Sequence, residues 1–411
     1  MNTIFLKDIE ISSDYPVIVD GKVLEIDNGR DVNWVFRYNG SLYRLIINSD
    51  IQQGRWKSIQ EFMKGPEIKE LMNRKYIPEY ELTDLKLEGY ENGDIYKIID
   101  EVYCVYDEMG DNFRTISQQL DCIKLICSIS FFLEKSNSNY SLTDIGYFNV
   151  GFNYSKPVFI DVGSFSTIYY DEWVPDSIQE MLDICGNSSN HHLNISFDGD
   201  WFNLNEAIDL AEINLEKGEW GGYSNLSHLN YESKIAFDWL DSKNDIKTII
   251  DVGCGNGEFS KLFCNKGYNV ISMDYNEYCV DNLYKSSTGM NIFCMKIDIT
   301  KDYTNNLGSK WKKYISGDVV FCSSITHHLY HSEYNMTFEK QAELWNTIAT
   351  KYLIIEYIDK KDSCLVNWTF GEDYTKDNFL KSLDKNWEVL DTKPSEYPDR
   401  YWYFFKKREH I

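Results

Sequence analysis

Residues 248–257 read Thr-Ile-Ile-Asp-Val-Gly-Cys-Gly-Asn-Gly, and this stretch decides the fold of the C-terminal half of the chain. A short apolar run, Thr248–Val252, enters a turn in which every second residue is glycine. A helical pattern with Phe259, Leu262 and Phe263 follows. Glycine lets a backbone approach a ligand without a Cβ clash, and a helix N-terminus presents free N–H groups to an anionic group. The stretch therefore predicts a binding turn for a nucleotide-like cofactor.

Two further predicted strands also end in acids, which indicates the kind of cofactor. Val270–Asp274 is the second strand and Ile292–Asp298 the third. A glycine turn alone also occurs in dinucleotide-binding folds, but Asp251 and the Asp-x-Gly-x-Gly-x-Gly form favour S-adenosylmethionine (SAM) over NAD. Asp274 is expected to accept the ribose hydroxyls and Asp298 the adenine amino group. Each acid by itself is equally typical of a solvated strand end or a helix cap.

The remaining pattern alternates helices and strands to the end of the chain. Asp318–Cys322, Tyr352–Glu356, Trp387–Leu390 and Tyr401–Phe405 complete seven predicted strands. Their order resembles that of class I SAM-dependent methyltransferases, in which the last strand inserts antiparallel beside the sixth. We therefore expect an α/β, Rossmann-like seven-stranded sheet that binds SAM and releases S-adenosylhomocysteine (SAH). The predicted cofactor-binding residues are Asp251, Gly253, Cys254, Gly255, Asn256, Gly257, Asp274, Tyr275, Asp298, Ile299, Ser323 and Tyr231.

Three of the seven histidines follow the fourth strand, where this fold faces the methyl group. They are His327, His328 and His331. Imidazole titrates near neutrality, so His327 is predicted to be the general base, with His328 as the alternative. The histidines may instead only stiffen the helix start, or bind a metal together with Glu356. Adjacent histidines on a helix diverge by about 100°, so no metal site is predicted. The absence of Asn-Pro-Pro-Tyr after this strand favours a hydroxyl acceptor over a base amine or glutamine.

Longer stretches are similar to a known group of enzymes. Asp318–Leu329 with its paired histidines, and Leu353–Asp362, resemble bacterial methyltransferases of the nodulation-protein type. Tyr140–Phe152 and Pro157–Phe165 are similar to the N-terminal region of the same group. The resemblance implies a small-molecule or carbohydrate acceptor. The sequence departs from the group at Ser323–Thr326, where a more apolar run is expected, and this leaves the acceptor open.

The N-terminal region is predicted to be an α+β domain. A strand, Asn39-Gly40 and a second strand form a hairpin signal, and helices are expected over 56–74, 113–135 and 203–216. The spacing of Asp144, Asn149 and Asp161-Val-Gly resembles the protein-kinase order of catalytic Asp, metal-binding Asn and Asp-x-Gly.

Other kinase features are missing from this region. Arg44 stands where a kinase has lysine, and no glycine-rich loop precedes it. A degenerate kinase-like domain is therefore one hypothesis, and simple turn-forming roles for the acids and the asparagine are the other.

Composition bounds the remaining expectations. The chain has 411 residues and is 43% hydrophobic, which suggests two domains with packed cores. We expect an N-terminal domain over 1–175, a linker and lid over 176–226 and a methyltransferase domain over 227–411, with Tyr223, His228 and Tyr231 as lid contacts. The net charge of −24 disfavours nucleic acid as a partner.

No signal peptide or membrane span is recognised, and the ten cysteines lack any CxxC pair. A cytoplasmic protein, possibly a homodimer, is therefore expected. The rival hypotheses are a bifunctional kinase-like methyltransferase and a catalytically silent SAM-binding scaffold.

Overall fold

The computed structural model divides the chain into two compact units. Unit 1 comprises Met1–Cys104 and Gln118–Asn214, and unit 2 comprises Val105–Ser117 and Leu215–Ile411. The structure describes residues 2–11, 18–19, 22–23, 33–46, 55–100, 102–103, 113–167, 173–188, 195, 197, 200–211, 213, 215–217, 226–301, 315–331 and 334–409.

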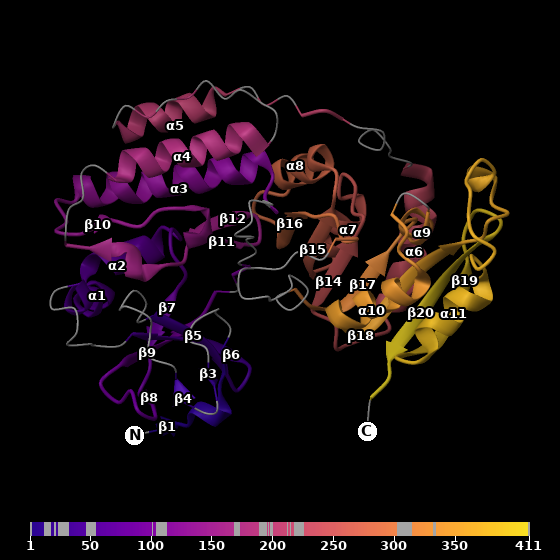
Figure 1. Ribbon diagram of the computed structural model, residues 1–411, viewed down its shortest axis with the longest axis horizontal. Helices are drawn as coiled ribbons and strands as arrows, with labels where there is room; N and C mark the ends of the chain where they lie inside the picture. The colour runs from indigo at the N-terminus through magenta and orange to yellow at the C-terminus, as the bar shows by residue number, and fades with distance from the viewer. Residues whose placement is uncertain are drawn as a thin grey trace. The chain divides into compact units, whose positions relative to one another are not determined.

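Unit 2 is built on a seven-stranded sheet with the order β16-β15-β14-β17-β18-β20-β19 (Figure 1). Neighbouring strands from β16 to β18 are parallel, and β20 is antiparallel to both β18 and β19. This confirms the predicted Rossmann-like sheet, including the antiparallel last strand. The strands are β14 (Thr248–Val252), β15 (Asn269–Asp274), β16 (Ile292–Lys296), β17 (Gly317–Cys322), β18 (Ala349–Ile358), β19 (Trp387–Pro394) and β20 (Arg400–Lys407).

The inner strands are apolar because helices cover them. Ile249, Ile250, Val319 and Val320 are fully buried, as expected for a parallel sheet that is shielded on its faces. Helices α7 and α8 contact β14–β16, and α10 and α11 contact β17–β19. The helices are α6 (Leu226–Leu240), α7 (Glu258–Asn265), α8 (Glu277–Ser286), α9 (Thr326–Tyr330), α10 (Phe338–Ile348) and α11 (Lys376–Asp384), with a 3₁₀ turn at Ser363–Leu365.

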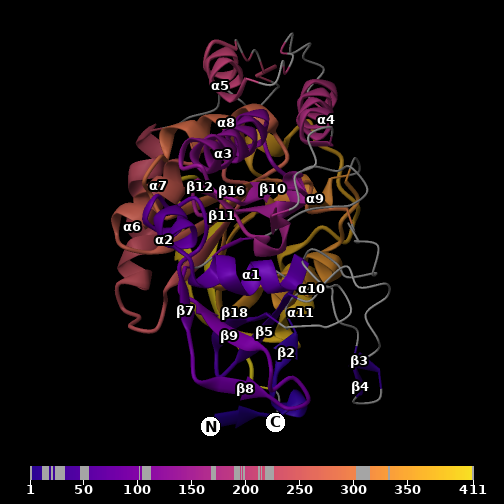
Figure 2. The ribbon, with the colours of Figure 1, turned by 90° about the vertical axis from the view of Figure 1, so that its left-hand side faces the viewer.

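Unit 1 contains an antiparallel five-stranded sheet of order β2-β5-β6-β9-β7, and Figure 2 shows helix α1 above strands β5 and β9 in that view. The predicted hairpin is present, with Asn39 and Gly40 both at positive φ (48° and 74°) in its two-residue turn. The sheet strands are β2 (Glu10–Ile11), β5 (Asn33–Tyr38), β6 (Ser41–Ile46), β7 (Tyr80–Leu82) and β9 (Asp94–Ile98).

The other described elements of unit 1 include short strand pairs and α-helices. The pairs join β1 (Asn2–Ile4) to β8 (Leu85–Leu87), β3 (Ile18–Val19) to β4 (Lys22–Val23), β10 (Ser141–Leu142) to β13 (Phe165–Ser166), and β11 (Val150–Asn153) to β12 (Lys156–Phe159). The helices are α1 (Arg55–Lys64), α2 (Pro66–Asn73), α3 (Ile116–Lys135), α4 (Trp173–Ser188) and α5 (Trp201–Asp209).

Helix α3 is the longest helix among the described residues. Its 20 residues have a mean hydropathy of 1.3 over an 18-residue window, enough to cross a membrane by length and composition alone. The sequence predicted a helix over 113–135 and no membrane span, so the helix is confirmed and its length and hydropathy are a finding of the structure. Because 67% of the window is buried inside the protein, α3 has the character of a core helix.

The three residues that resemble a kinase site hold local turns. The Asn149 side chain donates to the backbone oxygen of Asp144 over 3.0 Å. The Asp161 carboxylate accepts from the N–H of Gly163 over 2.9 Å and from the hydroxyl of Ser164 over 2.7 Å. A kinase-like fold therefore stays a prediction, since these contacts are equally those of ordinary turn residues.

A short segment that the sequence analysis assigned to the N-terminal domain lies in unit 2. The N–H groups of Ile116 and Ser117 donate to the carboxylates of Glu277 (3.0 Å) and Asp281 (3.1 Å) on α8. The backbone oxygen of Phe113 accepts from the N–H of Lys296 over 2.9 Å, at the end of β16. These bonds fasten residues 113–117 beside the strand that leads to Asp298.

Candidate functional site

The glycine turn after β14 has the backbone that the sequence predicts. Gly253, Gly255 and Gly257 have φ of 72°, 53° and 80°, in the left-handed region that favours glycine. Gly257 caps α7, so the free N–H groups of that helix begin directly after the turn. The N–H of Gly253 donates to the backbone oxygen of Met273 over 2.8 Å, which ties the turn to β15.

Asp274 joins the glycine turn to the end of β15. Its carboxylate accepts from the N–H of Gly255 over 2.9 Å and from that of Asn276 over 2.9 Å, one bond to each oxygen. Burial raises the pKa of this carboxyl, and the N–H donors oppose the rise. Because each carboxylate oxygen can accept more than one hydrogen bond, both oxygens keep capacity for ribose hydroxyls.

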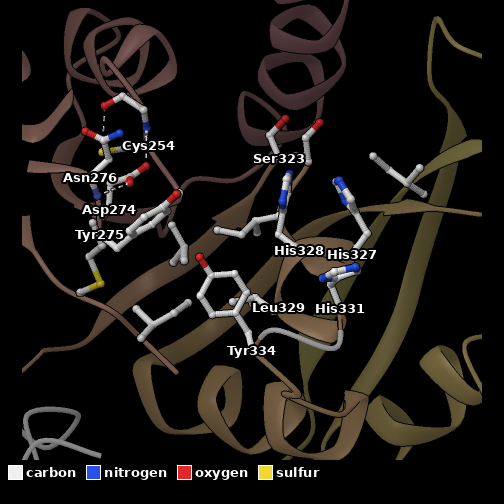
Figure 3. A pocket seen from close by; sticks show the side chains of 18 of the residues that line it. Cys254, Asp274, Tyr275, Asn276, Ser323, His327, His328, Leu329, His331 and Tyr334 are labelled. Atoms are coloured by element: carbon white, nitrogen blue, oxygen red, sulfur yellow. Dashed lines mark hydrogen bonds between the residues drawn. The ribbon is translucent and has the colours of Figure 1, made fainter. Parts of the chain in front are cut away.

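A cavity of about 890 Å³ opens at the carboxyl ends of the parallel strands (Figure 3). This is the place where open α/β sheets bind ligands, and the volume suits a cofactor with a small acceptor beside it. The predicted site residues that line the cavity are Gly253, Cys254, Gly255, Asp274, Tyr275, Asp298, Ile299, Ser323, His327 and His328.

Four predicted cofactor residues lie elsewhere: Asp251, Asn256, Gly257 and Tyr231 are not among the lining residues. Asp251 is buried behind the turn, where it accepts from the hydroxyl of Ser260 over 2.5 Å, and burial raises its pKa to about 7. Its observed contact supports the turn. Tyr231 is 42% exposed on α6. Of the other two lid candidates, Tyr223 and the side chain of His228 lie outside the described residues.

The cavity wall that follows strands β15 and β16 is lined by polar and aromatic side chains. Asp298 accepts from the N–H and the hydroxyl of Thr300, over 3.0 and 2.6 Å, so its carboxylate is fixed at the cavity edge. Tyr275 lies 6.4 Å, ring centroid to ring centroid, from Tyr334, which follows α9. Sequence reasoning missed Tyr334, because it stands in a loop without any motif.

The histidines of α9 form the opposite wall, as Figure 3 shows. His327 is 5% exposed, and its Nδ1 has no hydrogen-bond partner among the described residues. Burial lowers the pKa of His327 well below its ordinary value and that of His328 to about 4. Both imidazoles are therefore neutral at pH 7. The rings of His327, His328 and His331 lie 4.8–5.3 Å from that of Trp368, which also lines the cavity.

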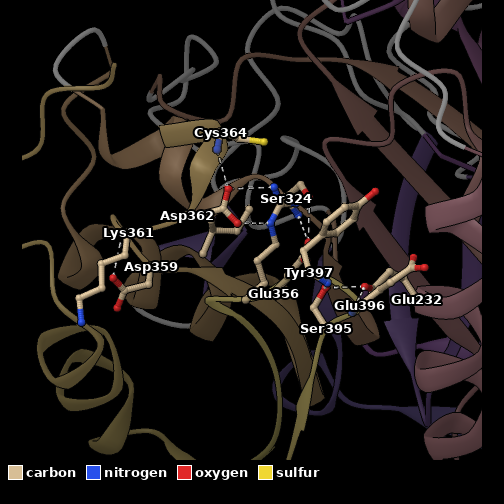
Figure 4. A network of polar contacts seen from close by, with 12 residues as sticks. Glu232, Ser324, Glu356, Asp359, Lys361, Asp362, Cys364, Ser395, Glu396 and Tyr397 are labelled. Carbon is tan, nitrogen blue, oxygen red and sulfur yellow. Dashed lines mark hydrogen bonds and ion pairs between the residues drawn. The ribbon is translucent and has the colours of Figure 1, made fainter. Parts of the chain in front are cut away.

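Three buried ionisable groups lie beside the histidine wall, and a role was predicted from sequence for only one of them. Arg400 lines the cavity and forms a bidentate ion pair with Asp362, with Nε–Oδ2 at 2.7 Å (Figure 4). Glu356, considered from sequence only as a metal ligand, is fully buried and accepts from the hydroxyl and N–H of Ser324, over 2.7 and 3.0 Å. No sequence pattern predicted the pair of Arg400 and Asp362, because it forms between segments that are distant in the sequence.

A metal site at the histidines finds no support in the part of the chain that the structure describes, where no group of three or more His, Cys, Asp or Glu side chains is placed to hold an ion.

Comparison with known proteins agrees with this geometry. Residues 250–342 match a family model described as a methyltransferase domain. A curated relative, the ubiquinone biosynthesis O-methyltransferase of Pseudomonas paraeruginosa, is 26% identical over 132 residues, which are 30% of this chain and 53% of that protein. The chain thus spans about half the length of the curated relative it matches.

Two of the similar solved structures are methyltransferases that match part of this chain. One is magnesium protoporphyrin IX methyltransferase of Synechocystis with bound SAM, at 16% identity, covering 44% of this chain and 78% of that one (TM-score 0.31). The other is the N-methyltransferase NodS of Bradyrhizobium japonicum with SAH, at 10% identity, covering 44% and 88% (TM-score 0.36). Because the identities and TM-scores are this low, neither structure supports a conclusion about the methyl acceptor of this chain. The family match covers residues 250–342, and the sheet order is that of the class I methyltransferase fold, whose cofactor is SAM.

Proposed function

We propose that unit 2 is a class I methyltransferase domain that O-methylates a hydroxyl of a small molecule or glycan, with His327 as the general base and His328 as the alternative. One observation carries the proposal: a single cavity is lined by the glycine turn, by Asp274 and Asp298, and by two neutral histidines. The O-methyltransferase match supports the choice of oxygen, although the solved structures include an N-methyltransferase.

The residues present fit SAM. An added Cβ at Gly255 would meet no protein atom within 4 Å, so the turn is open for close approach of a ligand. The glycine turn and the start of α7 would hold the amino-acid portion, Asp274 the ribose, and Asp298 with the N–H of Ile299 the adenine. When bound, SAM supplies an activated methyl group on a sulfonium.

The histidine wall is suited to the proton that an O-methylation releases. Methylation of a hydroxyl would release the hydroxyl proton, which a group in the cavity wall must take up. The Nδ1 of His327 has no hydrogen-bond partner among the described residues, and burial keeps the imidazole neutral, so it could accept that proton and would then carry the positive charge.

Calorimetric titration of the full chain with SAH tests the cofactor part of the proposal. Wild type is expected to bind with micromolar affinity, and Asp274→Ala to lose about two orders of magnitude, since a charge-assisted contact and the anchor of Gly255 both disappear. Absence of binding to a folded wild type would sink the proposal and favour a scaffold role. With binding shown, SAH release in a screen of hydroxyl, amine and thiol acceptors decides the acceptor class.

For unit 1 we propose a kinase-like fold without phosphotransfer. The antiparallel five-stranded sheet and the Asp144, Asn149 and Asp161 spacing support the fold. The buried Arg44, whose guanidinium donates to the backbone oxygen of Ile160 over 2.7 Å, argues against a kinase-type lysine function. ATP with magnesium is expected to leave the thermal unfolding of unit 1 unchanged; a clear upward shift would show nucleotide binding.

A further inference from the structure

The turn that connects β17 to the histidine helix contains a residue in an unusual conformation. Ser324 has a φ of 52°, in the left-handed region that side-chain-bearing residues rarely adopt. Two residues later α9 begins, and it presents His327 and His328 to the cavity. A strained conformation of this kind persists only where its surroundings hold it, so the contacts of Ser324 decide where the histidines lie.

Those contacts converge on one side chain, Glu356 of β18 (Figure 4). Its Oε2 accepts from the N–H of Ser324 over 3.0 Å, from the Ser324 hydroxyl over 2.7 Å and from the Ser323 hydroxyl over 3.4 Å. Its backbone oxygen accepts from the hydroxyl of Thr326 over 3.1 Å. One residue on the neighbouring strand thus holds both sides of the turn.

Glu356 is buried in a position that is unfavourable for a carboxyl group. It is fully buried, it does not line the cavity, and its Oε1 has no partner among the described residues. Burial raises its pKa to about 7, with the bonds from Ser324 opposing the rise. A buried carboxyl costs free energy that an apolar side chain of similar size would avoid. A fully buried carboxyl at this position of β18, two residues before the strand ends, calls for a role beyond packing.

We propose that Glu356 is a positioning residue: its carboxyl holds Ser324 in the left-handed conformation and so fixes His327 and His328 in the cavity wall. The proposal rests on the proposed function only in treating these histidines as the proton acceptors. Gln341 of α10 assists from the other side, since its amide donates to the backbone oxygen of Thr326 over 3.2 Å.

Four variants of the full chain test the role: Glu356→Gln, Glu356→Ala, Ser324→Gly and the double variant Glu356→Ala with Ser324→Gly. Glutamine keeps an acceptor oxygen for Ser324, whereas alanine removes it. Glycine adopts a φ of 52° without the penalty that serine carries, so it removes the need for an anchor. Side-chain NMR titration of the histidines follows their environment, and calorimetry with SAH follows the cofactor site separately.

In wild type and in Glu356→Gln, both histidines are expected to titrate below the ordinary range of an imidazole. In Glu356→Ala the turn relaxes, water reaches the imidazoles, and the pKa of at least one rises by about one unit or more. The double variant should recover most of that change, while SAH affinity stays within about threefold throughout.

Two results overturn the proposal. One is a Glu356→Ala variant whose histidines titrate as in wild type, and the other is a double variant no closer to wild type than the single one. If Glu356→Ala does not fold, a comparison of Ser324→Ala with Ser324→Gly takes its place. Both variants lose the hydroxyl bond to Glu356, and only the alanine variant keeps the backbone strain. Equal titration in that pair also overturns the proposal. Failure of wild type to bind SAH would remove the proposed function without altering these histidine measurements.

Discussion

Gly253 lies directly against Ile325: a Cβ added to the glycine would be 2.4 Å from Cδ1 of the isoleucine. The first residue after β14 and the turn after β17 are therefore in contact, so the cofactor turn and the histidine-bearing turn support each other. Both residues line the cavity. Small changes at this contact are expected to affect both the packing of the site and its ligand.

Gly253 and Gly255 should differ in what they support. Gly253→Ala introduces both a φ penalty and a clash with Ile325, and should lower the free energy of unfolding by about 2 kcal/mol or more. Gly255→Ala has a similar φ but open space around its Cβ. It should cost only about 1 kcal/mol in stability, yet lower SAH affinity about tenfold or more, because the methyl group occupies the approach to the ligand. Thermal unfolding and calorimetry of the pair check this, and equal losses in both measurements would contradict it.

Replacing His327 should affect turnover more than cofactor binding. His327→Gln keeps a polar side chain of similar size but cannot take up a proton at neutral pH, so kcat is expected to fall by about 10²–10⁴-fold with the KM for SAM unchanged. His328→Gln serves as the matched control, and its kcat should fall less than that of His327→Gln. The measurement is SAH formation with the acceptor that a screen identifies. A larger loss in His328→Gln would exchange the two assignments.

The sequence predicted the parts of this site that depend on local pattern. The glycine turn, Asp274 and Asp298 follow strands whose apolar runs are readable, and parallel strands bring their carboxyl ends together. Asp251 fits the same motif, yet the structure places it behind the turn, because this position of β14, two residues before Gly253, is buried against Ser260 of α7. Tyr334 and Arg400 were not predictable, because a loop residue and a strand residue enter the cavity only through tertiary contacts. The same holds for residues 113–117, whose attachment to α8 has no sequence signal.

Tyr334 is expected to help retain the cofactor. Its ring and that of Tyr275 form a tilted pair, with 58° between their planes, and both line the cavity. An aromatic pair contributes about 0.5–1.5 kcal/mol beyond the area it buries. Tyr334→Ala should therefore weaken SAH binding by about three- to tenfold, mainly through faster dissociation, and Tyr334→Phe should stay close to wild type. Stopped-flow displacement of SAH gives the rates. Unchanged dissociation in Tyr334→Ala would remove the pair from the cofactor site.

Asp251 should make the stability of unit 2 fall as the pH rises. Burial raises its pKa from 3.8 to about 7, so the folded state holds a proton that the unfolded state releases between these values. The stabilisation is therefore complete below about pH 4 and is lost as the pH rises through about 7, by about 4 kcal/mol at most. Asp251→Asn keeps an acceptor for Ser260 and removes the ionisation, so its unfolding free energy should vary less between pH 5 and 8.

Asp318→Asn serves as a control for that measurement, because the pKa of Asp318 is shifted in the opposite direction to that of Asp251. Hydrogen bonds from the N–H groups of Lys247 and Thr248, together with the Lys351 ion pair, lower the pKa of Asp318 against the effect of its partial burial. The stability that Asp318 contributes is fully present above its ordinary pKa, so the variant should be destabilised by a constant amount from pH 5 to 8. Urea unfolding of the full chain at several pH values gives the slope of the unfolding free energy against pH for each variant. The transition of unit 2 is identified as the one that moves to higher urea when SAH is added. A wild-type slope that persists in Asp251→Asn would mean that this carboxyl is already ionised in the folded protein.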